Sequence, residues 1–435
     1  MKAIQKNSGW IIILLLSFFP AFLWWQAPSF APRFGDFTGA MTSIGQLLGL
    51  IGAVMFALNL ILSARFHFLE KYFGGLDGVY AKHNVLGQVA FIFLLFHPLF
   101  LLARYSAGSF AGAASFLSIG SYWPRNLGTL SLALMLVLIV LTLYLRPKYN
   151  IWKWTHKFLG FAFFMASMHV WLIPSDVSRY MPLRWYVLGI SVIGLLAFAY
   201  RTLFGWLLVK KFKYTVLGVR ALSDSITEIT MRPVSERMIF TPGQFIFVSF
   251  SGKTIGGESH PFSITSGPDD QNISIIAKSL GDYTAKLSAL LPGTPAKIEG
   301  PFGNFSYKNA KNKDQIWIAG GIGVTPFISM AKSLKIEDGY NIDLYYCVKN
   351  ESEAVYLDLL KNISASLNGK FKVIPYYTDK EVRITADIIQ KTTGRLTMNN
   401  DIFLCAPPAM IESLRKQFLF KKVKRKLIHS EEFSF

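Results

Sequence analysis

Cysteine is nearly absent from this sequence, with only Cys347 and Cys405 among 435 residues. A disulfide framework of the kind found in small secreted proteins is therefore excluded, and a reducing cytosolic setting suits both positions. Acidic residues are also scarce, because 26 Asp and Glu stand against 45 Lys and Arg and leave a net charge of +19. We interpret this excess as the basic loops of a membrane protein, and we expect no nucleic-acid partner.

Charge of either sign is missing from long runs within residues 1–209, whereas residues 210–435 read as a soluble α/β sequence. Because about 20 apolar residues cross a bilayer, we predict a bundle of six transmembrane helices at 10–27, 41–63, 84–104, 127–145, 154–173 and 185–209. Bulky residues at 22–26 argue against cleavage of the first as a signal peptide. Lys and Arg concentrate in alternate loops, so we expect both termini on the cytoplasmic side of the cell (inner or plasma) membrane.

Four histidines lie in or at the ends of the third and fifth predicted spans, where ionisable residues default to a functional role. His83 and His97 are 14 residues apart, and His156 and His169 are 13 apart, which corresponds to about 21 and 19 Å along a helix. His83 should therefore meet His156 at one level and His97 should meet His169 at another. Two facing imidazoles are what a six-coordinate haem iron requires. The alternative is that each histidine pairs with a neighbouring polar group.

The 13-residue interval does not fit an ideal helix, because it leaves the side chains of His156 and His169 about 140° apart around the axis. Either the fifth span is locally irregular, or the two haems approach this helix from different azimuths. The sequence leaves both possibilities open.

From residue 212 the pattern changes to six short β-rich runs bounded by Gly, Pro and Asp, which are typical of a small antiparallel barrel. These runs are 214–219, 226–231, 244–250, 260–266, 273–278 and 295–299. After residue 314, strands alternate with helices, and the strand at 315–319 runs into a glycine-rich turn at 320–326. Such a turn before a helix suits a pyrophosphate. Further strands are expected at 342–348, followed by Lys349, and at 401–405.

Taken together, these motifs resemble the ferredoxin reductase family attached to a ferric-reductase-type membrane domain, the plan of NADPH oxidases and ferric reductases, including bacterial homologues. The resemblance implies a transmembrane di-haem domain (1–209), an FAD-binding β-barrel domain (210–310) and an NAD(P)H-binding α/β domain (311–435). It implies that two b-type haems are ligated by His83, His97, His156 and His169. It implies that FAD is held by His260, Pro261, Phe262, Ser263, Lys278, Gly281, Tyr283 and Thr284. The nicotinamide nucleotide would be held by Gly320, Gly321, Gly323, Thr325 and Pro326.

The resemblance also implies two residues near the reacting rings. Cys405 matches a cysteine beside the nicotinamide, although Ala406 replaces the usual glycine, and Phe435 matches the aromatic residue that covers the flavin, with Phe433 as the alternative. Lys349 favours NADPH, because a cation there suits a 2′-phosphate, while NADH stays possible.

The expected function is electron transfer from cytosolic NAD(P)H through FAD and two haems to an extracytoplasmic acceptor. Oxygen, giving superoxide, is the first expectation, and ferric iron or another one-electron acceptor is the alternative. Some members of the family have a polar residue one helical turn past the outer histidine, which is His97 here. Leu101 occupies that position in this sequence, which weakens the case for oxygen. A haem subunit without turnover would not need the complete flavin and nucleotide motifs. A transporter with buried histidines is a third class, and it would show no Soret band. No obligatory protein partner is expected.

Overall fold

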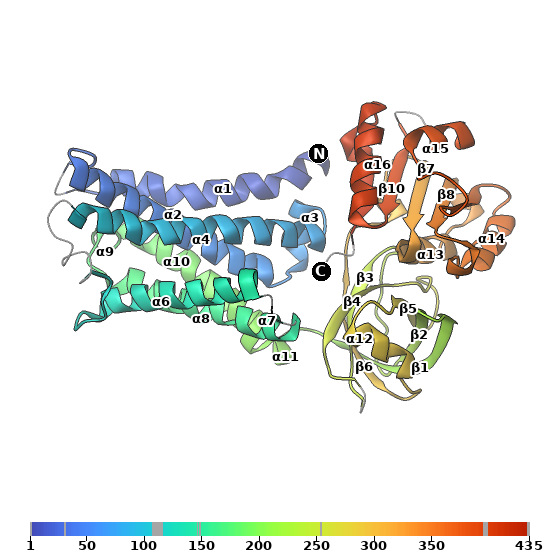
Figure 1. Cartoon of the computed structure of the whole chain (residues 1–435), viewed down its shortest axis with the longest axis horizontal. Helices are drawn as coiled ribbons and strands as arrows, with labels where there is room; N and C mark the ends of the chain where they lie inside the picture. Colours follow the sequence, from blue (N-terminus) through green and yellow to red (C-terminus); the bar gives the residue numbers. More distant parts are fainter. Residues whose placement is uncertain are drawn as a thin grey trace. The chain divides into compact units, whose positions relative to one another are not determined.

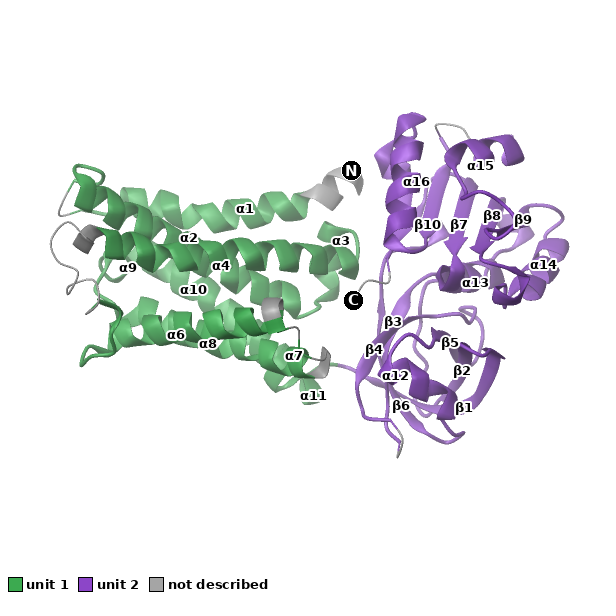
Figure 2. Ribbon diagram, in the orientation of Figure 1, with its two compact units in different colours: residues 1–209 green, residues 210–435 purple. Residues whose placement is uncertain are grey.

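Residues 1–209 and residues 210–435 form separate units, here called unit 1 and unit 2 (Figure 2). The computed structural model describes residues 2–29, 32–106, 116–145, 147, 149–252, 255–394 and 399–432. Unit 1 is helical, and unit 2 contains two β-sheets with their helices (Figure 1).

The helices of unit 1 agree broadly with the apolar runs. They are α1 (Lys2–Gln26), α2 (Phe37–Ser63), α3 (His67–Phe73), α4 (Leu76–Ser106), α6 (Trp123–Val140), α7 (Tyr149–His156), α8 (Phe158–Leu172), α9 (Asp176–Arg179), α10 (Met181–Phe198) and α11 (Gly205–Leu208). Helices α6 and α10 each continue into a π-helical turn, at Leu141–Leu145 and Ala199–Leu203. Within the described residues, five helices are long and apolar enough to cross a membrane: Ser8–Gln26, Phe37–Ser63, Leu76–Ala103, Trp123–Val140 and Met181–Leu203.

The fifth predicted span is divided between α7 and α8. Helix α8 has 15 residues, which is short of the roughly 20 needed to cross a bilayer. The division lies at Lys157, where Lys157 N–H donates to Trp154 O at 3.2 Å and Gly160 N–H donates to Lys157 O at 3.1 Å. These are bonds between residues three apart, so the helix is tightened there into a 3₁₀ turn.

Helix α2 lies at the centre of unit 1 and is its most buried long helix. Asp36 caps its start by accepting a hydrogen bond from Gly39 N–H at 2.6 Å. Gly45, Gly49 and Gly52 form one stripe along the helix, and a Cβ atom at any of them would lie 2.6 to 3.0 Å from side chains of α4. Small residues therefore let α2 and α4 approach closely, as in other membrane helix pairs.

The first sheet of unit 2 contains all six strands predicted for the flavin domain. They are β1 (Phe212–Ser223), β2 (Ile226–Pro233), β3 (Phe245–Phe250), β4 (Ser259–Ser263), β5 (Ile273–Lys278) and β6 (Pro295–Phe302). The strands are antiparallel in the order β4-β3-β6-β1-β2-β5. A single bridge between Ile264 and Ile275 links the two edges, so the sheet is a half-open barrel. Helix α12 (Asp282–Ala285) follows β5.

The second sheet is parallel, with the order β11-β10-β7-β8-β9. Its strands are β7 (Asp314–Gly320), β8 (Asn341–Val348), β9 (Phe371–Tyr377), β10 (Asp401–Cys405) and β11 (Ile428–Glu431). Its helices are α13 (Thr325–Lys332), α14 (Leu357–Ser366), α15 (Ala386–Thr393) and α16 (Pro408–Phe420). Apolar clusters cover both faces. The strand order reverses between β7 and β10, and ligands of such folds bind at that switch point.

Candidate functional site

The four span histidines lie on α4, α7 and α8. His97 Nδ1 is 2.6 Å from the carbonyl oxygen of Gly45, and His169 Nδ1 is 2.7 Å from that of Pro124. A carbonyl oxygen only accepts, so each ring must donate from Nδ1. In a neutral ring this leaves the lone pair on Nε2, which is the arrangement of metal-binding histidines.

Glycines make room for these two rings. A Cβ atom at Gly49 would lie 2.6 Å from His97 Nδ1, and one at Gly128 would lie 2.9 Å from His169 Nδ1. The helix pairs α2–α4 and α6–α8 therefore hold their histidines in the same way. A backbone carbonyl of the neighbouring helix accepts a hydrogen bond from Nδ1, and a glycine of that helix leaves space for the imidazole ring.

His83 and His156 lie beside one another, with ring centroids 6.2 Å apart and planes inclined by 70°. His83 Nδ1 is 3.1 Å from the carbonyl oxygen of Asn59. His156 Nδ1 is buried and has no hydrogen-bond partner in the described part of the chain. The ring of Trp152, one turn earlier, stacks on His156 at 5.2 Å. This pair is thus held less symmetrically than His97 and His169.

The helix break at Lys157 lies between His156 and His169. A 3₁₀ turn advances about 120° per residue instead of 100°, so the break turns His156 toward the direction of His169. The fifth span is thus locally irregular, which is one of the two explanations for the 13-residue interval.

The flavin motifs converge on strand β4 and helix α12. The ring of His260 stacks on that of Tyr283 with centroids 3.8 Å apart. His260 Nε2 lies 3.1 Å from a carboxylate oxygen of Glu258, and the Tyr283 hydroxyl donates to the Glu258 carbonyl at 3.1 Å. Burial raises the pKa of Tyr283 to about 12, so this hydroxyl stays a neutral donor. Thr284 Oγ1 accepts from Gly281 N–H at 3.1 Å and closes the turn before α12.

Two hydroxyls beside this motif are buried without partners. Within the described residues, Ser263 Oγ and Thr265 Oγ1 make no hydrogen bond. A buried hydroxyl left unpaired costs about 1–3 kcal/mol, so both suit the polar edge of a bound group. Phe262, between His260 and Ser263, is buried and closes the barrel core, and Pro261 is half-buried.

The glycine-rich turn follows β7 at the switch point of the parallel sheet. Gly321 has φ +56°, and no atom lies within 4 Å of an added Cβ. Glycine is therefore required at this position by the backbone conformation and not by lack of space. At Gly323 an added Cβ would lie 2.1 Å from the carbonyl oxygen of Cys405, so only glycine lets the turn pack on the end of β10. Thr325 Oγ1 donates to Ile322 O at 3.0 Å, and Pro326 occupies the first turn of α13.

Cys405 is the last residue of β10, fully buried between Ala319 of β7 and Glu431 of β11. It therefore lies at the carboxyl edge of the sheet, against the turn that contains Gly323. Phe435 and its alternative Phe433 fall outside the described residues.

A cavity of about 40 Å³ joins the flavin and nucleotide parts of unit 2. Lys278, at the end of β5, and Gly321, in the glycine-rich turn, both line it, together with Tyr346 and Glu353. Lys349 does not line this cavity; it is exposed just after β8, and its N–H donates to the Glu353 carboxylate at 3.4 Å.

One contact between the flavin and nucleotide parts of unit 2 could not be predicted from the sequence. Arg220 of β1 and Glu228 of β2 form an ion pair at 2.8 Å, and the Tyr356 hydroxyl of the nucleotide domain donates to the same Glu228 carboxylate. Burial and the neighbouring Glu228 carboxylate raise the pKa of Tyr356. Glu228 and Tyr356 are 128 residues apart, so no local motif joins them.

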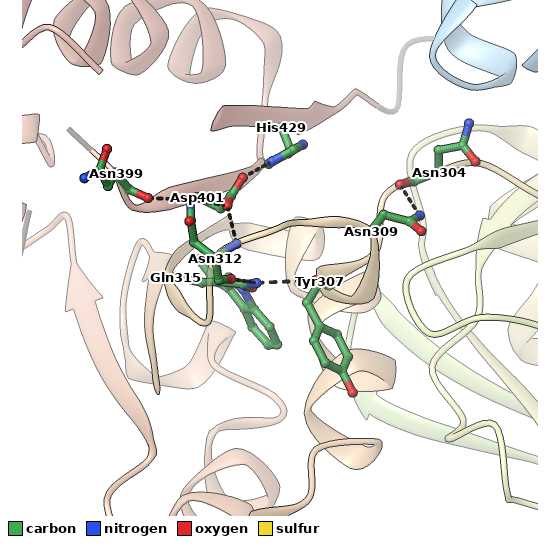
Figure 3. Close-up of polar contacts among 9 residues, drawn as sticks. Asn304, Tyr307, Asn309, Asn312, Gln315, Asn399, Asp401 and His429 are labelled. Carbon is green, nitrogen blue, oxygen red and sulfur yellow. Dashed lines mark hydrogen bonds and ion pairs between the residues drawn. The ribbon is translucent and has the colours of Figure 1, made fainter. Parts of the chain in front are cut away.

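Polar contacts also gather at the opposite, amino-terminal ends of β7 and β10 (Figure 3). The Asp401 carboxylate accepts from the backbone and side chain of Asn312, at 3.1 and 2.8 Å, and pairs with His429 at 2.6 Å. Gln315 bonds the carbonyl oxygens of Tyr307 and Asn312. These contacts fix the strand ends and the incoming chain, away from the glycine-rich turn.

Three domain families match the chain in succession. Residues 48–167 match the ferric reductase like transmembrane component, residues 211–324 an FAD-binding domain, and residues 317–416 an oxidoreductase NAD-binding domain. The chain joins a ferric-reductase-type membrane domain to FAD- and NAD-binding domains. With this matched membrane domain and its long apolar helices, the chain is a multi-pass membrane protein.

Oxidoreductases are among the relatives of this chain. A superoxide-generating NADPH oxidase heavy chain of Dictyostelium discoideum is 35% identical over 144 residues, 29% of this chain and 28% of that one. Ferric reduction oxidase 5 of Arabidopsis thaliana is 26% identical over 326 residues, 70% and 44% of the two chains. The flavohemoprotein of Candida albicans is 26% identical over 232 residues, 51% and 57%. The chain thus spans less than two thirds of the length of these curated relatives.

Among solved structures, a ferredoxin NADP+ reductase from Neisseria gonorrhoeae with bound FAD and NADP matches with a TM-score of 0.44 and 18% identity. The match covers 52% of this chain and 99% of that one.

Proposed function

We propose that the chain is a transmembrane oxidoreductase that takes electrons from cytosolic NAD(P)H through FAD and two b-type haems to a one-electron acceptor on the far side of the membrane. The observation that carries this proposal is the pair of Nδ1–carbonyl hydrogen bonds of His97 and His169, which leave Nε2 of each ring to a metal. The succession of the three domain families supports the same conclusion.

The histidines suit haem better than a metal ion held by protein alone. Within the described residues, no group of three or more His, Cys, Asp or Glu side chains is arranged to hold a metal, so paired histidines need a group that supplies the other ligands. The 6.2 Å between the ring centroids of His83 and His156 leaves room for one metal atom with bonds of about 2 Å, the length measured for imidazole on zinc.

The residues of unit 2 suit the remaining groups. When bound, flavin exchanges electron pairs with a nicotinamide and single electrons with haem. Ser263, Thr265 and the His260–Tyr283 stack would position the flavin ring system, and Lys278 would meet its pyrophosphate. Gly320, Gly321, Gly323, Thr325 and Pro326 would hold the nucleotide, with Lys349 toward the 2′-phosphate of NADPH. Cys405 would flank the nicotinamide, and Phe435 would cover the flavin.

The proposal includes the finer assignments of architecture. We assign residues 1–209 to the di-haem domain, 210–310 to the FAD domain and 311–435 to the NAD(P)H domain, supported by the unit boundary after Val209 and by the matched ranges. We count α8 as a sixth, short span, with both termini on the cytoplasmic side of the cell membrane, and we propose no obligatory protein partner.

Oxygen, giving superoxide, is our proposed acceptor, and ferric iron is the alternative. Leu101, one turn beyond His97, packs against Gly45 and brings no polar group there. The deciding experiment uses purified chain loaded with haem and FAD, supplied with NADPH and a dye that superoxide reduces. Superoxide dismutase should suppress dye reduction. Equal rates with and without the dismutase, together with rapid reduction of a ferric chelate, would favour the alternative.

Turnover itself needs a separate measurement. Steady oxidation of NADPH by the isolated chain supports the oxidoreductase, whereas a reduced-minus-oxidised spectrum with two haems and no NADPH oxidation supports a haem subunit that depends on a partner. A chain without a Soret band would contradict both.

A further inference from the structure

The end of helix α16 exposes an aromatic side chain. Phe420, its last residue, is 89% exposed, the largest fraction among the large apolar side chains of the described residues, and the preceding Leu419 is 40% exposed. An isolated apolar residue on a surface is ordinary, so the surroundings decide what this one means.

The chain after Phe420 forms a tight, well-anchored turn. Phe418, Val423 and Leu427 are buried and fix it to the core of the nucleotide domain. Lys422 N–H donates to Leu419 O at 2.9 Å, Val423 N–H to Phe418 O at 3.0 Å, and Leu427 N–H to Lys424 O at 2.9 Å. The residues between the anchors are therefore held outward.

The outward residues are cationic and uncompensated. Lys422, Lys424, Arg425 and Lys426 are exposed, and none forms an ion pair in the described part of the chain. Their neighbours behave differently, because Lys416 pairs with Glu412 at 2.7 Å and Lys421 pairs with Asp387 at 2.6 Å. Four exposed cations without ion pairs in the described residues thus follow an exposed phenyl ring within six positions of the chain. We call Leu419, Phe420, Lys422, Lys424, Arg425 and Lys426 the α16 turn.

We propose that the α16 turn binds the anionic headgroups of the membrane in which unit 1 is embedded. Cations around an exposed aromatic ring are the pattern of a surface that lies in a lipid interface, with the ring in the headgroup boundary and the charges on the lipid phosphates. The exposed ring favours lipid over an acidic protein, which would need only the cations. Unit 2 follows unit 1 directly in the chain, so the turn is tethered to the bilayer that holds unit 1 and needs little intrinsic affinity for lipid.

A fluorescent probe at position 420 tests the proposal. Phe420→Cys is labelled with an environment-sensitive dye, since Cys347 and Cys405 are both buried, and the full chain is reconstituted into nanodiscs of phosphatidylcholine alone or with phosphatidylglycerol. The dye emission should shift to the blue only with phosphatidylglycerol and should return in high salt. Val382→Cys is the matched control, because Val382 is 74% exposed and lies outside the turn; its dye should not respond.

Charge variants test whether the cations of the α16 turn cause the dye response. Replacing Lys422, Lys424, Arg425 and Lys426 by Gln should abolish the blue shift, and replacing the three lysines by Arg should keep it; retained FAD content shows that both variants are folded. Identical spectra in the two lipids, or equal shifts at 420 and 382, would overturn the proposal. A response to added polyglutamate but not to anionic nanodiscs would assign the turn to an acidic protein instead. The outcome does not depend on electron transfer.

Discussion

His97 Nδ1 donates to the carbonyl oxygen of Gly45 across 2.6 Å, so a backbone atom of α2 determines which nitrogen of a histidine on α4 is available to a metal. Backbone acceptors of this kind fix both the tautomer and the orientation of a metal-binding ring. The predictions on unit 1 follow from this contact.

Gly49→Ala should remove one of the two proposed haems. The added Cβ would lie 2.6 Å from His97 Nδ1, so the ring must move away from its acceptor. Haem per chain, measured as the pyridine haemochrome, should fall by about half. Gly189→Ala is the matched control, since an added Cβ there meets no atom within 4 Å. Unchanged haem content in Gly49→Ala would contradict the assignment of His97.

Histidine substitutions should group by pair. His97→Ala and His169→Ala should each remove the same haem, and the double variant should lose no more than either single one. Combining His83→Ala with His97→Ala should remove both haems, because these histidines are assigned to different levels. Spectra of the singles and doubles decide the pairing; additive losses from His97 and His169 would show that they do not share a metal.

Tyr356→Phe should slow flavin reduction without changing haem content. The variant loses the hydrogen bond to Glu228 that joins the nucleotide domain to strand β2, and a bond to a charged group contributes about 1.5–3 kcal/mol. Stopped-flow reduction by NADPH should become at least fivefold slower at subsaturating nucleotide. Tyr340→Phe, with a half-exposed ring elsewhere on the domain, provides the comparison. A rate equal to wild type would make the contact incidental.

Lys349→Glu should shift the preference from NADPH toward NADH. A carboxylate at the end of β8 repels a 2′-phosphate and accepts from a free ribose. A tenfold fall in the ratio of kcat/KM for NADPH over NADH corresponds to about 1.4 kcal/mol. Steady-state kinetics with both nucleotides measure it, and a ratio unaffected by the substitution would remove Lys349 from the nucleotide site.

Alkaline pH should destabilise unit 2 through Cys347. Burial, with a smaller contribution from Glu381, raises the pKa of this thiol from 9.0 to about 12. Above pH 9 the unfolded chain loses this proton while the folded chain keeps it, so the free energy of unfolding falls as pH rises. The fall should be about 1 kcal/mol between pH 9 and 10. Cys347→Ala should show a correspondingly shallower dependence when unfolding is followed by flavin release.

Much of the secondary structure of this chain could be predicted from periodic sequence patterns and from turn-forming residues. The apolar runs predicted the long helices and the β-rich runs predicted β1 to β6. The similar intervals from His83 to His97 and from His156 to His169 predicted that His83 and His156 lie side by side. The strands β9 and β11 were not predicted. Pro375 interrupts the first, and the second has four residues, so neither has a clear strand pattern.

Other features depend on backbone atoms or on tertiary packing, which the residue types in the sequence do not reveal. The acceptors of His97 and His169 are backbone carbonyls of Gly45 and Pro124, and any residue supplies a carbonyl. The helix break at Lys157 occurs without proline or glycine at that position. The Glu228–Tyr356 contact is formed by tertiary packing alone.

Helix α2 sets the distance between the two levels of histidine. It offers Gly45 to His97 and Asn59 to His83, and both intervals, 45 to 59 and 83 to 97, are 14 residues. Because a slide of α4 along α2 would break both hydrogen bonds at once, the two helices are held in one register. Fourteen residues of helix rise then separate His83 from His97 by about 21 Å along the axis. A thicker or thinner bilayer should therefore tilt the bundle and leave the distance between the two levels of histidine unchanged.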